Sequence, residues 1–389
     1  MAIYLDHAAT TPLRREVLDA MLPYLTEHQG NPSSIHASGR RARQGLDEAR
    51  ETVAGLLHAR PREIVFTSGG TEGANLAIKG AAWAGSARGR HLVTSAVEHR
   101  AVLGTCQLLE RHGFEVTYLP VDRYGRVTAE QVADAITPRT TLVSIGYANN
   151  EVGTIQPIRE IGSVCRERSV VFHTDAVQAA SCLPLDVDWL QVDLLSLAAH
   201  KFEGPKGVGA LFVRQGTNLV PEQQGGSQER QRRAGTEDVA GCVGLAAALA
   251  LARVDPAVQA EENQRQAALR GRLLAGLEAI SGGELTGHPE ERLPNLASWL
   301  FEGLEGGDLV AALDLEGVEA STGSACTSGS TEPSHVLLAL GYSEPRAHGS
   351  LRLSVGRTTT TPEVERGLEA AATCVARLRA TRSVAEVAG

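Results

Sequence analysis

Short apolar runs alternate with amphipathic stretches along most of the chain. The runs His91–Ser95, Thr141–Ile145 and Val170–Asp175 have the length and composition of strands, whereas Ala101–His112 and Ile158–Glu167 repeat apolar residues at helical spacing. Strands that alternate with helices form a mostly parallel sheet with helices on its faces. The pattern predicts an α/β fold in which ligands gather beyond the carboxyl ends of the strands.

The pattern changes in the last third of the chain. Residues 282–287 interrupt the helical spacing, and the short strands that follow indicate a second, α+β unit. A chain of 389 residues also exceeds what one hydrophobic core usually supports. We expect a large domain over residues 15–258 and a small domain formed by residues 1–14 and 259–389.

Composition narrows the classes of function. The net charge is −9 without a long run of one sign, which argues against a nucleic-acid-binding protein and favours a small molecule or protein as partner. The N-terminus lacks a signal-like pattern and no uncharged stretch reaches membrane-spanning length, so we expect a cytoplasmic protein that does not enter a membrane. The six cysteines show no zinc-like spacing, and we expect no metal site.

One lysine lies where a surface lysine is not expected. Lys201 follows an apolar run and precedes another, within Ala-Ala-His-Lys-Phe-Glu-Gly-Pro-Lys-Gly from Ala198 onward. It is the best candidate for the amine that holds pyridoxal phosphate (PLP) as a Schiff base. From this segment alone, an ordinary loop lysine remains the alternative.

A glycine-rich turn joins a strand to a helix near residue 70. The strand Glu63–Thr67 ends in Ser-Gly-Gly-Thr-Glu-Gly-Ala-Asn, and helical periodicity begins directly afterwards with Leu76. Small residues let the backbone approach an anion, the amides of the helix start face it, and Thr71 adds a hydroxyl donor. The turn after Gly70 therefore favours phosphate binding, although a tight connection alone would have the same sequence.

A carboxylate and an amide follow the strand that ends at Asp175. Gln178 lies three residues further along the chain. A carboxylate beside a pyridine nitrogen keeps it protonated, and a nearby amide can bond the phenolic oxygen of the same ring. A simple helix cap is the alternative for Asp175.

With these motifs assembled, the chain resembles the cysteine desulfurases of the NifS/IscS type, which are fold type I PLP enzymes. The resemblance covers nearly the whole chain. The motifs that carry it are Tyr4-Leu-Asp-His-Ala-Ala-Thr-Thr-Pro, Asn31-Pro-Ser-Ser, Gly70-Thr-Glu, Glu98-His, Asn149-Asn-Glu-Val-Gly, Asp175-x-x-Gln, His200-Lys, Gly204-Pro-Lys-Gly, Arg233-Ala-Gly-Thr, Gly323-Ser-Ala-Cys and Leu351-Arg-Leu-Ser-Val-Gly-Arg.

The resemblance implies a large domain with a seven-stranded, mostly parallel sheet flanked by helices, and a site for PLP. Lys201 would carry the cofactor and later act as a base, and His99 would stack on the ring and serve as an acid or base. The other cofactor contacts that it implies come from Gly70, Thr71, Asn150, Asp175, Gln178 and His200.

The resemblance also implies the substrate and the partners. Arg352 would bind the α-carboxylate of L-cysteine, assisted by Asn31 and Asn150, since a guanidinium fork suits a carboxylate. Cys326 would take the substrate sulfur as a persulfide and pass it to an acceptor protein such as an iron–sulfur scaffold. A homodimer is implied as well, in which Thr236 reaches the phosphate of the neighbouring subunit.

Two positions depart from the family pattern. Ala198 stands where a serine that contacts the phosphate is common, and Ser227 stands where a third glycine is usual. Loss of one neutral hydrogen bond of roughly 1 kcal/mol would weaken cofactor retention without abolishing it. We do not expect Ser196, two residues earlier, to reach the phosphate. A selenocysteine lyase and a sulfur-relay or scaffold protein without efficient catalysis are the alternative functions, and Cys326 argues against the first of them.

Overall fold

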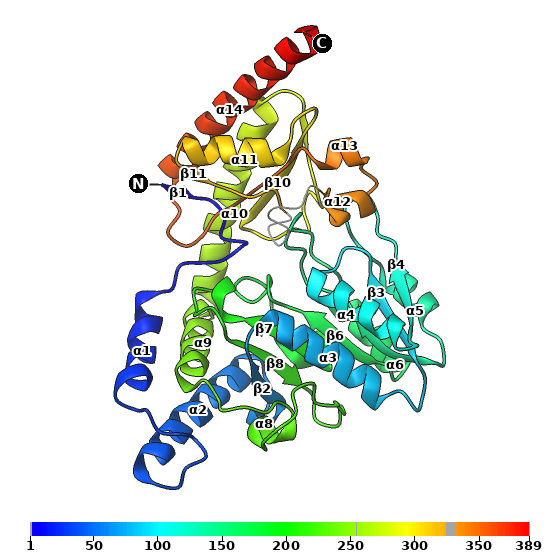
Figure 1. Ribbon diagram of the computed structural model, residues 1–389, viewed down its shortest axis with the longest axis vertical. Helices are drawn as coiled ribbons and strands as arrows, with labels where there is room; N and C mark the ends of the chain where they lie inside the picture. Colours follow the sequence, from blue (N-terminus) through cyan, green and yellow to red (C-terminus); the bar gives the residue numbers. More distant parts are fainter. Residues whose placement is uncertain (1, 254, 324–331, 389) are drawn as a thin grey trace.

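The computed structural model describes residues 2–253, 255–323 and 332–388, with the backbone alone for residues 382–388. Figure 1 shows a larger body built around a sheet and a smaller body beside one end of it. The long helix α10 (Pro256–Ala279) runs from one body into the other.

Seven strands form the sheet of the larger body, in the order β2-β8-β7-β6-β5-β3-β4. Strand β8 is antiparallel to both neighbours, and all other neighbouring pairs are parallel. This confirms the predicted α/β fold with a mostly parallel seven-stranded sheet. The strands are β2 (Ile64–Thr67), β3 (His91–Ser95), β4 (Glu115–Leu119), β5 (Thr140–Ser144), β6 (Val171–Asp175), β7 (Leu194–Ala198) and β8 (Gly209–Val213).

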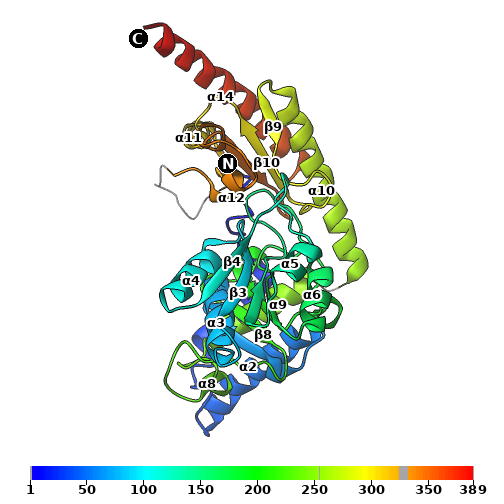
Figure 2. The same cartoon turned by 90° about the vertical axis from the view of Figure 1, so that its right-hand side faces the viewer.

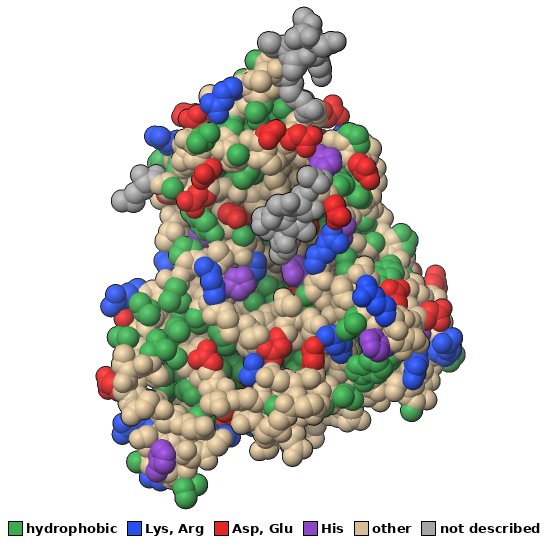
Figure 3. Space-filling view, in the orientation of Figure 1, with side chains coloured by type: hydrophobic (Ala, Val, Ile, Leu, Met, Phe, Trp, Pro, Cys, Tyr) green, Lys and Arg blue, Asp and Glu red, His purple; other side chains and the backbone are tan. Residues whose placement is uncertain are grey.

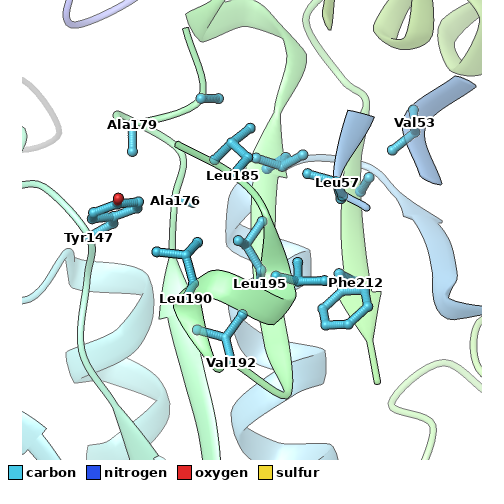
Figure 4. Packing of buried hydrophobic residues seen from close by; sticks show 14 of the residues in the cluster. Val53, Leu57, Tyr147, Ala176, Ala179, Leu185, Leu190, Val192, Leu195 and Phe212 are labelled. Atoms are coloured by element: carbon cyan, nitrogen blue, oxygen red, sulfur yellow. The ribbon is translucent and has the colours of Figure 1, made fainter. Parts of the chain in front are cut away.

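Helices cover both faces of the sheet because successive strand residues point to opposite sides. Leu194 and Leu211 pack with the cluster under α3 and α4, whereas Leu195 and Phe212 pack on the other side with Val53 of α2 (Figure 4). The helices are α1 (Arg15–Thr26), α2 (Ala37–Leu56), α3 (Gly70–Ala84), α4 (Arg100–Arg111), α5 (Ala129–Ala135), α6 (Ile158–Glu167), α7 (Val187–Leu190), α8 (Gln228–Gln231) and α9 (Val239–Ala252), with short 3-10 turns at Pro61–Glu63 and Ala199–Lys201.

The smaller body is built on an antiparallel sheet of three strands in the order β12-β10-β9, packed against α10, α11 and α14 (Figure 2). A two-stranded parallel sheet joins β1 to β11. The elements are β1 (Ile3–Tyr4), β9 (Gly283–Leu285), β10 (Leu296–Phe301), β11 (Val318–Glu319), β12 (Ser350–Ser354), α11 (Gly306–Leu315), α12 (His335–Ala339), α13 (Glu344–Ala347) and α14 (Thr361–Ala388).

The N-terminal segment returns to the smaller body. Ile3 and Leu5 are buried in the same cluster as Leu273 and Phe301, and Ile3 pairs with Val318. The segment then crosses to the larger body, where the N–H of Thr11 bonds the carbonyl of His200. The predicted boundary at residue 258 falls near the start of α10, and the division into two domains stays a prediction.

Some local predictions differ from the structure. Helix α3 begins at Gly70 rather than near Leu76, because the glycine turn itself forms the first helical turn. The expected break at residues 282–287 contains β9, and α11 was not predicted because it is short and begins with two glycines. Neither difference alters the sheet on which the predicted site depends.

None of the described helices is, by itself, long and apolar enough to cross a bilayer. Helices α9 and α10 meet that criterion only when they are taken together, and they are bent by 81° relative to one another.

Candidate active site

A cavity of about 360 Å³ lies at the carboxyl ends of β3, β5, β6 and β7, where the N-terminal segment and the smaller body meet the sheet. Parallel strands bring the residues that follow them to one edge, which explains why side chains far apart in sequence converge here. The predicted residues that line it are Gly70, Thr71, His99, Asn150, Asp175, Gln178, His200, Lys201 and Arg352.

Lys201 ends the 3-10 turn that follows β7. Its Nζ donates to the carbonyl oxygens of Ala8 and Ala9, at 2.6 Å and 2.7 Å. Gln178 donates from Nε2 to the same Ala8 oxygen at 2.9 Å. The backbone of the N-terminal segment therefore holds the amine at the cavity wall, which sequence reasoning did not foresee because carbonyl groups leave no signal in side-chain identity.

The start of α3 forms one wall of the cavity. A side chain at Gly70 would place its Cβ only 2.6 Å from Cγ2 of Val177, so a larger residue would have to displace the Val177 side chain. The same Cβ would lie 3.5 Å from Cβ of Ala198, which shows that the Ala198 side chain faces the helix start. The backbone amides of this turn and the hydroxyl of Thr71 can therefore meet a phosphate, but Ala198 supplies no donor to it.

Ser196 does not replace the missing hydroxyl. Its Oγ lies 2.9 Å from Nε2 of the buried His173, whose Nδ1 is in turn 2.9 Å from Oγ of Ser144. Burial lowers the pKa of His173 to about 3, so its ring is neutral at pH 7. Ser196 belongs to this internal network beneath α3, as we expected from its position.

Asp175 is the last residue of β6 and lines the cavity. Burial raises the pKa of its carboxyl, while His99, the N–H of Val177 and Lys201 lower it. Its Oδ1 accepts the N–H of Val177 at 3.0 Å. A cation placed beside this carboxylate would offset the cost of burial, as a protonated pyridine nitrogen does.

His99 and His200 flank the cavity from two different loops. Nδ1 of His99 caps α4 by accepting the N–H of Ala101 at 3.1 Å, so the neutral ring carries its proton on Nε2. Burial, and then the charge of Lys201, lower the pKa of His200 to about 4. Its Nδ1 lies 3.2 Å from Oγ1 of Thr10. The His200 ring is therefore a neutral hydrogen-bonding group at pH 7.

A buried glutamate precedes His99 and was missed as a functional candidate. Glu98 lines the cavity, and its carboxylate accepts from Oγ of Ser95 at 2.6 Å and from N of Gly146 at 2.9 Å. Burial raises its pKa to about 7. The carboxylate links the loop of His99 to the loop after β5. In the sequence, only the position of Glu98 directly before His99 could have marked it as a functional candidate.

Arg352 lies on β12 with a side chain that is only 2% exposed. Its Nη2 donates to Oδ1 of Asp6 at 2.7 Å, and its Nη1 donates to the carbonyls of Asn150 at 2.8 Å and Gly323 at 3.1 Å. The guanidinium therefore joins the N-terminal segment, the loop after β5 and the residue that precedes Ser324. Asp6 was also missed, since it is 346 residues away in sequence.

Two predicted residues do not line the cavity of the single described chain. Asn31 and Thr236 are exposed to solvent, and Oδ1 of Asn31 accepts the N–H of Ser33 at 2.8 Å. Cys326 lies outside the described residues. No cluster of three metal-ligating side chains occurs within the described parts of the chain.

The residues that are present fit PLP. The cavity offers a helix start at Gly70 whose backbone amides could meet a phosphate, the buried carboxylate of Asp175, which could meet a ring nitrogen, and the amine of Lys201. Gln178 and Asn150 supply amides beside the same space. An aldehyde with a phosphate and a basic ring nitrogen matches this set of groups.

Comparisons with known proteins agree with this chemistry. The family described as Aminotransferase class-V matches residues 3–366. A cysteine desulfurase IscS of Methanosarcina thermophila is 52% identical over 97% of this chain and 93% of its own length. A cysteine desulfurase IscS of Dictyoglomus turgidum is 50% identical over 97% of this chain and 95% of its own length.

Solved structures show the same likeness. A NifS-like protein superimposes with a TM-score of 0.91 at 36% identity, covering 97% of this chain and all of its own. A structure described as SspA in complex with cysteine has a TM-score of 0.79 at 39% identity, covering 90% of this chain and 98% of its own.

Proposed function

The chain belongs to the aminotransferase class-V family and, within it, to the cysteine desulfurases of the IscS type, and we propose that it uses PLP to convert L-cysteine to L-alanine with transfer of the sulfur. The convergence of Lys201, Asp175 and the start of α3 on one cavity carries this proposal. The two relatives named above cover this chain almost end to end, which extends the likeness from the site to the whole enzyme.

PLP, when bound, supplies an electron sink that makes the Cα proton of an amino acid acidic. Lys201 would hold it covalently, with the backbone after Gly70, Thr71 and His200 at the phosphate and Asp175 at the ring nitrogen. Gln178 and Asn150 would bond the phenolic oxygen side. After its release by the substrate amine, Nζ of Lys201 would take the Cα proton, within reach of the Ala8 and Ala9 carbonyls that can hold the resulting ammonium.

Arg352 would bind the α-carboxylate of the substrate. The contact of its guanidinium with the carboxylate of Asp6 supports this role, because a substrate carboxylate could make the same kind of bond. Asn150 lies beside it, because the Asn150 carbonyl accepts from Arg352, and Asn31 would assist. His99 would take the proton of the substrate thiol or return one to the product.

Cys326 would receive the sulfur. Its thiolate would form a bond to the substrate sulfur while the bond between Cβ and sulfur breaks with its electron pair left on carbon. A proton added at Cβ, and return of the Cα proton from Nζ of Lys201, would complete alanine. The outcome is a persulfide on Cys326, which would pass its terminal sulfur to the thiol of an acceptor protein such as an iron–sulfur scaffold. A cytoplasmic location stays a prediction of the sequence.

A homodimer is the assembly we propose. Figure 3 shows apolar side chains gathered over α1, and Leu22, Leu25 and Ile35 are 47%, 59% and 90% exposed. Asn31 and Thr236 are exposed as well, as expected if a second copy brings them to its cavity. Sedimentation of wild type and of Ile35→Asp tests this: a mass near twice 41.1 kDa that falls to one chain in the variant supports it, and a wild-type monomer refutes it.

The test of the function is product release from L-cysteine by protein reconstituted with PLP in the presence of a reductant. We expect equal amounts of alanine and sulfide from wild type, and loss of both from Lys201→Ala and Cys326→Ala. Alanine formation without Cys326 would point to a lyase such as one for selenocysteine. A wild-type protein that neither binds PLP nor forms product would instead support the scaffold alternative.

A further inference from the structure

Two residues of the sequence motifs, Glu72 and Arg233, form an ion pair beside the start of α3. Nε of Arg233 donates to Oε1 of Glu72 at 2.9 Å, and Nη2 donates to Oε2 at 3.4 Å. The side chains of Arg233 and Glu72 are 21% and 20% exposed, so the pair is largely shielded from water. Neither residue lines the cavity of the described chain. Any effect of the pair on the cavity therefore acts through the residues that lie between them.

Glu72 holds the glycine turn that joins β2 to α3. Its Oε2 accepts the N–H of Ser68 at 2.7 Å, so the side chain bridges from the first turn of the helix back to the end of the strand. The two cavity residues of the turn, Gly70 and Thr71, lie between Ser68 and Glu72 in the chain. The Glu72 carboxylate therefore restrains the direction in which the backbone amides of this turn point.

Arg233 comes from a loop whose conformation is fixed by a second, buried ion pair. The carboxylate of Glu229 accepts from Nη1 and Nη2 of Arg50 at 2.7 Å and 2.6 Å, and from the N–H of Phe66 at 3.0 Å. Glu229 and the two residues after it have φ angles of 45°, 57° and 64°, a left-handed conformation that is unfavourable for residues other than glycine. Such strain persists only where the surrounding contacts hold it. Arg233 therefore ties the glycine turn to a fixed point on the protein.

The ion pair also determines the charge beside the turn. Burial raises the pKa of the Glu72 carboxyl, but the bonds from Arg233 and Ser68 outweigh burial and hold this pKa below its ordinary value. Glu72 is therefore a carboxylate at pH 7, and it directly follows Thr71 in the chain. The positive end of a helix attracts anions, so a Glu72 carboxylate without its arginine would compete with a phosphate for the start of α3.

We propose that Glu72 and Arg233 are positioning residues for the phosphate of PLP. This inference rests on the proposed function, in which the backbone after Gly70 and the hydroxyl of Thr71 meet that phosphate. The carboxylate keeps the turn in shape, while the guanidinium anchors the carboxylate and neutralises its charge. Because the pair adjoins the turn and lies outside the cavity, it acts on the binding of the phosphate and not on that of the ring or the aldehyde.

Pyridoxal separates these contributions, because it has the ring and the aldehyde of PLP but lacks the phosphate. The cofactor-free protein is titrated with PLP and, separately, with pyridoxal, and the absorbance of the bound compound gives each dissociation constant. In Glu72→Gln and Arg233→Gln the dissociation constant for PLP should rise by about tenfold or more, as it does when the supporting contacts of metal sites are removed, and that for pyridoxal should stay within about twofold of wild type.

Two further variants test whether the residues act as a pair. Glu72→Gln combined with Arg233→Gln should bind PLP no more weakly than Arg233→Gln alone, because each single change already breaks the ion pair and the second removes the unpaired charge. Arg233→Lys keeps the positive charge and should bind PLP more tightly than Arg233→Gln does.

Glu222→Gln is the matched control for the loss of an ion pair on α3. Oε1 of Glu222 lies 2.6 Å from Nζ of Lys79, so this pair also joins α3 to the chain that leads into the loop of Arg233. Lys79 lies more than two helical turns beyond Gly70, away from the start of the helix. Glu222→Gln should leave both dissociation constants unchanged.

Three outcomes would overturn the inference. Wild-type affinity for PLP in both Glu72→Gln and Arg233→Gln would show that the pair does not position the phosphate. Equal weakening of PLP and pyridoxal binding would show a general effect on the cavity. Equal weakening of PLP binding in Glu222→Gln would show that the effect is not particular to the helix start. A wild-type protein that binds PLP no more tightly than pyridoxal would instead overturn the phosphate site of the proposed function.

Discussion

Replacing Ala198 with serine should tighten the binding of PLP. The Ala198 side chain faces the start of α3, where a Cβ on Gly70 would lie 3.5 Å from that of Ala198, and it is 2% exposed. A hydroxyl there would meet the phosphate with little rotamer freedom to lose. A hydrogen bond to a charged group contributes about 1.5–3 kcal/mol, which corresponds to a gain of about ten- to a hundredfold or more in affinity.

The assay is a titration of the cofactor-free protein with PLP, followed by absorbance, for wild type and Ala198→Ser. Ala148→Ser is the matched control, because Ala148 lines the same cavity from the loop after β5 rather than from β7. It should leave the affinity for PLP unchanged. A gain below about twofold in Ala198→Ser, or an equal gain in Ala148→Ser, would refute the placement of the phosphate at the start of α3.

Three further changes probe the carboxylates and arginines of the structure. Glu98→Gln removes a carboxyl whose pKa is about 7 in the folded protein, above its ordinary value of 4.5. As pH rises from 4.5 to 7, this carboxyl ionises in the unfolded chain but stays protonated in the folded protein, which destabilises the folded wild type. The free energy of unfolding of the wild type, measured in urea, should fall by about 3 kcal/mol relative to that of Glu98→Gln over this pH range. Arg352→Lys keeps a charge but loses the fork, and it should raise KM for L-cysteine by about ten- to a hundredfold. Glu229→Gln breaks a buried ion pair with Arg50, whose Nη2 is 2.6 Å from Oε1, and should lower the free energy of unfolding by about 3–5 kcal/mol.

Each of these expectations has an outcome that contradicts it. A difference between wild type and Glu98→Gln that does not vary with pH would mean that the buried carboxyl does not titrate near 7. An unchanged KM in Arg352→Lys would place the substrate carboxylate elsewhere. A loss below about 1 kcal/mol in Glu229→Gln would show that the ion pair is solvated and not buried.

The central sheet could be predicted because its strands are continuous apolar runs that end in polar residues. Both faces of these strands are covered, so each run stands out against the amphipathic helices between them. Because His99, Asn150, Asp175 and Lys201 each follow one of these strands in the sequence, the same logic predicts that they lie at one edge of the sheet. Strand and helix periodicity therefore sufficed to place these four residues near the cavity that they line, whereas Arg352 and His200 were assigned through the family resemblance.

The contacts that support those residues could not be predicted in this way. Asp6 reaches Arg352 across 346 positions, and Arg50 reaches Glu229 across 179. No local pattern encodes such pairs, because they depend on how the two bodies and the chain ends pack. The backbone carbonyls that bind Lys201 could not be predicted from the sequence either, because every residue supplies a backbone oxygen.

The course of the N-terminal segment has a consequence for how the enzyme matures. Ile3 pairs with Val318 and the carbonyl of Leu5 bonds the N–H of Ser354, yet Ala8 and Ala9, only a few residues further, hold the amine of Lys201. During synthesis this segment leaves the ribosome before its strand partners Val318 and Ser354. The wall that holds the Lys201 amine is therefore completed only after those later residues have been made and have packed against the segment.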